Sequence, residues 1–151
     1  MKNLEELIEE QGIIAVNFEQ SVYKMAAHYS ANYNGGFWNS INFPDTELFI
    51  MQLDEKKEYE IQNSANFDQN SMDVVMDAKT FSLCVFAMTA NHFGLRIHED
   101  AQLLEKEGKL EVAKFSEEIA GIYFDMFYLA RNKAEELLSE DNQKLFYAFI
   151  D

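Results

Sequence analysis

The sequence predicts an α+β fold in which a small antiparallel β-meander of three to four strands packs against several α-helices. Its 151 residues suit a single domain, 1–151, and 48% hydrophobic residues are enough to bury a core. A single proline and six glycines leave few interruptions, which favours long helices. Short, aromatic-rich segments between residues 37 and 62 alternate between apolar and polar positions, which is typical of strands.

Two helices are predicted in the N-terminal part. Leu4, Leu7 and Ile8 are spaced for a short helix that ends near Gly12. A second helix is expected over 17–33, with Asn17 as its N-cap. Its apolar face consists of Phe18, Val22, Met25, Ala26 and Tyr29. Residues 34–36, Asn-Gly-Gly, end this helix, because adjacent glycines permit positive backbone torsions.

The strands follow as three short segments at 37–43, 48–53 and 59–62. Pro44 and Asp45 mark the first turn, and the charged residues 54–57 mark the second. Such short connections favour an antiparallel meander. The polar, asparagine-rich segment 63–71 is expected to be a loop.

The C-terminal half reads as helical. A helix from Met72 to about Asn91 is apolar on several faces, which indicates a central buried helix, and residues 91–94 end it. Residues 97–109 are strongly charged, and Gly108 separates them from a helix over 111–138. The apolar stripe of that helix consists of Phe115, Ile119, Ile122, Met126 and Leu129. Ser139 is expected to cap a last helix that buries Leu145, Phe146 and Phe149.

Charge limits the classes of partner. With 12 basic and 27 acidic side chains the net charge is −15, which repels nucleic-acid phosphates, so direct nucleic-acid binding is not expected. Such a surface attracts basic proteins, including grooves built to hold DNA, although the charge alone could serve only solubility. The segment 44–77 carries a local net charge of −7. Its acids are Asp45, Glu47, Asp54, Glu55, Glu58, Glu60, Asp68, Asp73 and Asp77, against Lys56 and Lys57.

The cysteine count and the N-terminal sequence both indicate the cellular compartment. Cys84 is the single cysteine, so no intramolecular disulfide can form, which fits a reducing compartment. Glu5 and Glu6 stand where a signal peptide has its apolar core, and the apolar run 81–90 is too short to span a bilayer. We therefore expect a cytoplasmic protein without membrane association.

Signals of catalysis and of metal binding are weak. His92 and His98 lie six residues apart, which does not place them on one helix face as a metal-binding pair. Cys84 has apolar neighbours, which favours a core residue over a nucleophile. No phosphate-binding loop and no nucleophile-elbow motif occurs. The expectation is a protein that is not an enzyme and that uses no cofactor or metal.

One local pattern is specific: Tyr33, Gly35, Gly36 and Trp38 within the hexapeptide YNGGFW place a double glycine between aromatic residues. This hexapeptide resembles the Y-x-G-G-x-W motif of the ArdB/KlcA antirestriction family. Phe49 and Met51 are similar to the F-x-M of that family's second strand. Further matching blocks are Asn66, the segment from Ser71 to Ala78, Asn91 with His92, and the terminal Ile150 and Asp151.

The chain also departs from the family pattern. Gln52 and Leu53 follow the strand methionine where the family tends to have Ala-Pro, and Asp45-Thr46-Glu47 replaces a glycine pair. Segment 97–121 is longer and more charged than its equivalent, as an inserted helix would be. These departures bear more on the choice of partner than on the fold.

The resemblance implies an antirestriction protein that relieves type I restriction of incoming DNA without catalysis. The partner would be a protein, either type I restriction enzyme subunits or a DNA-processing complex. The acidic residues that we expect to bind it are Asp45, Glu47, Asp54, Glu55, Glu58 and Glu60, with Asp151 nearby.

Other functions stay open at this point. An acidic DNA mimic would inhibit another DNA-binding protein by placing carboxylates where phosphates normally bind. A small enzyme or ligand-binding domain would use a pocket under Trp38. An acidic protein of unrelated cellular role is the remaining alternative.

Overall fold

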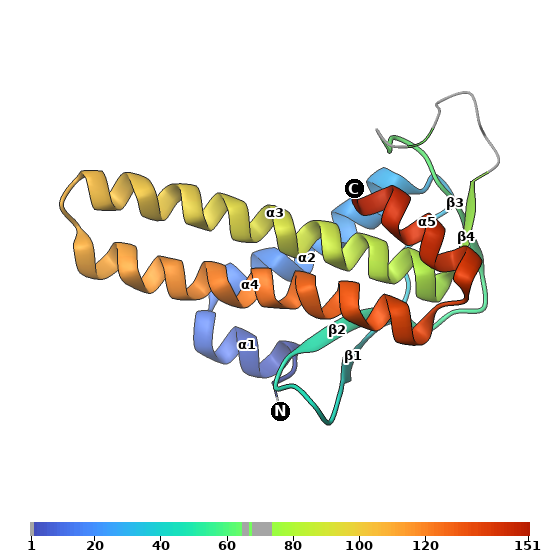
Figure 1. Ribbon diagram of the computed structural model, residues 1–151, viewed down its shortest axis with the longest axis horizontal. Coiled ribbons are helices and arrows are strands. Elements are labelled where there is room, and N and C mark those ends of the chain that lie inside the picture. The colour runs from blue at the N-terminus through green and yellow to red at the C-terminus, as the bar shows by residue number, and fades with distance from the viewer. Residues whose placement is uncertain (1, 65–66, 68–73) are drawn as a thin grey trace.

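The computed structural model describes residues 2–64, 67 and 74–151, and it confirms the α+β class. Two long antiparallel helices form the body, and the other elements lie along them, leaving the end with the α3–α4 turn projecting (Figure 1). The elements in chain order are α1 (Leu4–Gln11), α2 (Ile13–Tyr29), β1 (Trp38–Asn42), β2 (Phe49–Leu53), β3 (Glu58–Glu60), β4 (Val75–Asp77), α3 (Ala78–Lys106), α4 (Leu110–Leu137) and α5 (Glu140–Ile150).

The central helix α3 is longer than the sequence predicts. It starts at Ala78, where the side chain of Asp77 accepts a hydrogen bond from the Thr80 amide at 2.8 Å. As predicted, its first part is buried on several faces. The helix does not end at residues 91–94. Gly94 is buried inside it, where a β-carbon would lie 2.7 Å from the Phe124 ring of α4. This glycine therefore serves close helix packing.

The charged segment 97–121 is accordingly no separate helix. It contains the last third of α3, the connecting turn and the start of α4. Gly108, with φ +81°, makes the turn as expected. Ile119, Met126 and Leu129 of the predicted α4 stripe are buried, but Phe115 is 58% exposed, because the hairpin projects past α1 and α2 at this end (Figure 1).

Helix α1 ends at Gln11 as predicted, whereas both ends of α2 differ from the prediction. Gly12, with φ +62°, lets α2 start at Ile13, so Asn17 lies inside the helix and is not its cap. The helix ends at Tyr29, before the predicted end at Tyr33. Residues that follow β3 satisfy its last two carbonyls: the Gln62 and Asn63 side chains donate to the His28 oxygen, and the Gln62 backbone amide donates to the Tyr29 oxygen at 2.8 Å.

The strands form two separate antiparallel ribbons, β1–β2 and β3–β4, and not one meander. In the first, Trp38 pairs with Leu53 and Asn42 with Phe49. Strand β2 does not pair with β3, because β3 pairs with β4. Residues 75–77, which form β4, were expected to belong to a helix, and this expectation is wrong. The Leu53 amide donates instead to the Ser82 hydroxyl of α3, at 2.8 Å. The predicted loop positions 65–66 and 68–71, the motif position Asn66, Ser71 and the predicted helix start at Met72 lie outside the described residues.

The last helix agrees with its prediction. The Ser139 hydroxyl accepts a hydrogen bond from the Asn142 amide at 3.2 Å, and Phe146 and Phe149 are buried, with Leu145 half-buried. One hydrophobic core joins α2, β2, α3, α4 and α5. Within the described ranges, no helix has the length and apolar character needed to cross a bilayer.

Candidate functional site

The glycine-aromatic segment between α2 and β1 is a packed hinge. Gly35 adopts φ +84°, a torsion that favours glycine. Beyond it the chain returns, so that the Trp38 indole nitrogen donates to the Tyr33 hydroxyl at 2.9 Å. Their rings meet edge to face, 6.4 Å between centroids, and the Tyr33 ring lies equally far from that of Tyr59 on β3. The hinge therefore joins both ribbons.

Gly36 lies where the β2–β3 connection comes close to the segment between α2 and β1. A β-carbon there would lie 2.7 Å from both the Glu55 carboxylate and the Leu53 side chain. We expect the Gly36→Ala variant to lose about 1–3 kcal/mol of unfolding free energy, the usual cost of overpacking. Urea denaturation measures this loss. Gly121→Ala is the control, since a β-carbon there meets nothing within 4 Å; equal stability of the two variants would contradict the close approach.

Tyr59 fixes the β2–β3 connection from inside. Its buried ring stacks on Phe81 of α3, with centroids 4.6 Å apart and an interplanar angle of 13°. Its hydroxyl donates to the Glu55 carboxylate. Burial and this hydrogen bond both raise the pKa of the Tyr59 phenol above its usual value of 10.0. Glu55 is thus held by a neutral donor.

Asn32 and Lys57 hold the same connection from outside. The Asn32 side chain donates to the Glu58 carbonyl at 2.8 Å and accepts from the Glu60 amide at 3.0 Å. The Lys57 ammonium donates to the Asn32 carbonyl at 2.5 Å and lies 5.3 Å from the centroid of the Tyr59 ring. The segment from 54 to 60 is therefore fixed on two sides.

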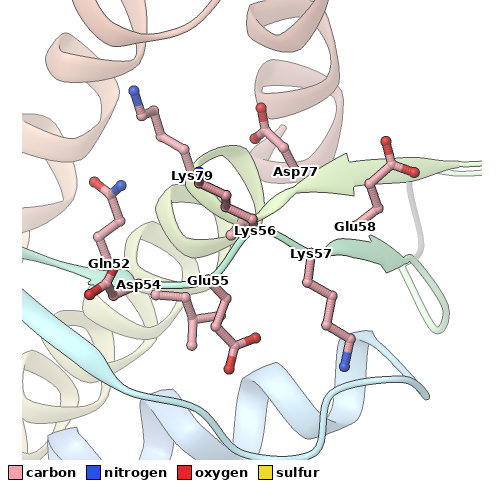
Figure 2. Close-up of a pocket in the computed structure, with 10 residues that line it drawn as sticks. Gln52, Asp54, Glu55, Lys56, Lys57, Glu58, Asp77 and Lys79 are labelled. Atoms are coloured by element: carbon pink, nitrogen blue, oxygen red, sulfur yellow. The ribbon is translucent and has the colours of Figure 1, made fainter.

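An open hollow of about 470 Å³ lies between this connection and the start of α3 (Figure 2). Its lining consists of Gln52, Leu53, Asp54, Glu55, Lys56, Lys57, Glu58, Asp77, Ala78 and Lys79. Four carboxylates and three ammonium groups thus share one concavity. Trp38 is not part of the lining, so this hollow, which lies beside the β3–β4 ribbon, is not the pocket expected under Trp38.

Glu58 and Asp77 are direct partners in the β3–β4 ribbon, and both are exposed. Figure 2 shows their carboxylates on the same side of the ribbon, with Glu55 and Lys57 extending to the other side. Like charges directly opposite each other destabilise a ribbon. Asp77 is partly compensated by the Thr80 amide and by Asn142, whereas no cation pairs with Glu58 in the described part of the chain.

The structure brings some of the predicted acidic residues together and separates others. Asp54, Glu55 and Glu58 line the hollow, and Glu60 follows on β3. Asp45 and Glu47 lie in the β1–β2 turn, at the opposite side of the molecule from the C-terminal Asp151 (Figure 1). Phe49 and Met51 of the family motif are buried in β2. The predicted face is therefore divided among three places.

Asp77, Lys57 and Lys79 at the hollow were not predicted as site residues. The sequence carries no strand signal at 75–77, because Val75 and Met76 are both apolar, and the alternation of burial appears only in the structure.

Ion pairing distinguishes the predicted acids. Asp45 pairs with the buried Lys133 at 3.3 Å, and this lysine also contacts Glu136 and the Phe43 ring. Salt bridges within the described ranges involve none of the other six, which are Glu47, Asp54, Glu55, Glu58, Glu60 and Asp151.

Groups that could support catalysis lie apart from the hollow. Cys84 is fully buried in α3, and burial raises the pKa of its thiol well above the usual value, which disfavours the nucleophilic thiolate. His98 pairs with Glu117 at 2.7 Å near the outer end of the hairpin. Over residues 2–64, 67 and 74–151, no three His, Cys, Asp or Glu side chains gather as metal ligands would.

Comparison with known proteins gives no relative: no protein-family model matches the sequence, no curated protein matches it, and no solved structure matches its fold. The resemblance of residues 33–38 to the antirestriction family therefore stays a prediction.

Proposed function

We propose that this protein acts by binding another protein, without catalysing a reaction, and that its effect is relief of type I restriction. The binding site is the β3 acidic surface, which we define as Asp54, Glu55, Glu58, Glu60 and Asp77. The partner presents a basic surface of the kind that contacts DNA, on a type I restriction enzyme or another DNA-processing complex in the cytoplasm.

The single observation that carries this proposal is that these five carboxylates outnumber the three lysines of the hollow, Lys56, Lys57 and Lys79, and form no salt bridge with them. Of the β3 acidic surface, no member forms a salt bridge within the described residues. The excess of negative charge attracts a basic partner over a distance of about 8 Å at physiological ionic strength. It also accelerates encounter and disfavours acidic partners.

The rigidity of this surface supports the proposal. Tyr59, Asn32 and Lys57 fix the segment that carries the carboxylates, so binding need not order a flexible loop. The hinge residues Tyr33 and Trp38, which carry the family resemblance, contact this support and not the partner. Their part in the function is to position the acidic surface.

Reversing the charges tests the site. The triple variant Asp54→Lys, Glu58→Lys, Glu60→Lys spares Glu55, which Tyr59 holds. Expressed in a host with a type I restriction system, the wild-type protein should raise the plating efficiency of unmodified phage, and the variant should lose most of this effect, since attraction becomes repulsion.

The matched control reverses Glu9, Glu99 and Asp125. These three residues are also exposed, form no salt bridge among the described residues, and give the same change in net charge. It should protect like the wild type. If both variants lose protection equally, overall charge and not this surface is responsible.

A further inference from the structure

Helix α2 runs alongside α3 in the opposite direction (Figure 1), and an open groove of about 400 Å³ lies between the two helices. Phe18 of α2 holds them together, because its ring contacts those of Phe86 and Phe93 on α3. On the other side of α3, Gly94 allows close packing against the Phe124 ring of α4. The groove thus lies between two fixed helices, and its volume is in the usual range of small-molecule sites, about 300–1,000 Å³.

Part of the groove is apolar. Ile14 of α2 and Phe93 and Ile97 of α3 line it, and all three side chains are half-buried. The Phe93 ring also contacts the buried rings of Phe18 and Tyr123, at 5.5 and 5.4 Å between centroids. This apolar surface is therefore continuous with the core, and a ligand with an apolar body would gain free energy by burying that body against it.

The uncharged polar side chains of the lining all belong to α2. They are Asn17, Gln20 and Ser21. Within residues 2–64, 67 and 74–151, none of these side chains donates or accepts a hydrogen bond. Their amide and hydroxyl groups therefore remain available as donors and acceptors for a ligand.

The charged side chains of the lining are Lys24, Arg96 and Asp100. All three are exposed, and none forms a salt bridge in the described part of the chain. Two cations and one carboxylate give the lining a charge of +1, although the whole chain carries −15. The nearest acids in sequence, Glu19 and Glu99, lie outside the lining. The groove is therefore complementary to a single negative charge.

We propose that the groove between α2 and α3 binds a small organic monocarboxylate with an apolar body. Lys24 and Arg96 attract the carboxylate, and the planar guanidinium of Arg96 can donate to both of its oxygens. The body packs against Phe93 and Ile97. Asp100 repels a second negative charge, so a phosphate ester, which carries nearly two charges, fits less well. This inference does not depend on the proposed function.

Titration of isotope-labelled protein, followed by amide NMR, tests the site. Phenylacetate, hexanoate and indole-3-acetate should shift the amides of the lining residues, with the millimolar affinity that is usual for such small ligands. The uncharged phenylacetamide, the cationic benzylamine and the dianionic phenyl phosphate should each bind at least about fivefold more weakly than phenylacetate. If none of the three carboxylates shifts these amides, or if the amide binds as well as the acid, the proposal is wrong.

Substitutions separate the groove from overall charge. The double variant Lys24→Gln, Arg96→Gln should bind phenylacetate about tenfold more weakly. Its matched control is Lys106→Gln, Lys144→Gln, since both lysines are exposed, lie outside the lining, form no salt bridge among the described residues and give the same change in net charge. Equal weakening in the two double variants would contradict the site.

Filling the groove provides a test that leaves the charges unchanged. Ser21 is half-buried in the lining, so the Ser21→Phe variant should occupy the space of the ligand body and abolish binding of all three carboxylates. Thermal unfolding checks that the variant is folded. Phenylacetate binding that persists in the folded variant would place the ligand elsewhere and overturn the proposal.

Discussion

Replacing Tyr59 with alanine should lower the unfolding free energy by about 3–5 kcal/mol, the usual cost of truncating a buried aromatic side chain. The loss combines the stacked contact with Phe81 and the support that Tyr59 gives to the β2–β3 connection. The β3 acidic surface should also lose its fixed shape. Chemical denaturation measures the first effect, and partner binding well below the melting temperature measures the second.

The Tyr59→Phe variant separates packing from the hydrogen bond. It keeps the ring on Phe81 and removes the donor to Glu55, so a loss of about 1 kcal/mol is expected. Because the pKa of this phenol is raised in the folded state, Tyr59 stabilises the fold fully below its usual pKa of 10.0 and less as pH rises above it. The phenylalanine variant should lack this part of the alkaline decline. Equal stability of the alanine and phenylalanine variants would contradict the packing role.

Replacing Phe18 with alanine should have a comparable effect, again about 3–5 kcal/mol. This side chain of α2 is fully buried and contacts the rings of Phe86, Phe93 and Tyr123 at centroid distances of 5.7, 5.5 and 5.0 Å. It joins α2 to both long helices, so its loss leaves a cavity at the centre of the core.

The control for Phe18→Ala is Tyr128→Ala, an exposed aromatic side chain on α4. It should change the stability by no more than about 0.5 kcal/mol, as surface substitutions usually do. Urea unfolding of both variants provides the comparison. A small loss for Phe18→Ala would show that α2 is held by other contacts.

Local patterns in the sequence predict much of this fold. The strand positions near 38–42 and 49–53, the turn at Gly108 and the Ser139 cap follow from side-chain alternation and from cap chemistry. The length of α3 does not, because whether Gly94 ends a helix or lets it pack closely depends on Phe124, thirty residues away. The pairing of β3 with β4 is likewise a long-range event.

For the candidate site, too, the sequence predicts local features but not long-range contacts. Sequence charge points to Asp54, Glu55, Glu58 and Glu60, which lie in one connected segment. It cannot show that Asp45 is paired with Lys133, which lies 88 positions further along the chain and is buried. Nor does it show that Asp77 stands opposite Glu58, since this depends on strand register.

The central claim is that the β3 acidic surface binds a basic protein partner without chemistry. Calorimetric titration of a purified type I restriction enzyme with the wild-type protein tests it most directly, with the two charge-reversed triple variants alongside. The account predicts binding that weakens as salt rises, that the control triple variant retains and that the Asp54, Glu58, Glu60 variant loses. If DNA displaces the protein from the enzyme, the protein binds at the DNA-binding surface and acts as a DNA mimic. Absence of binding, or equal binding by both variants, would contradict the account.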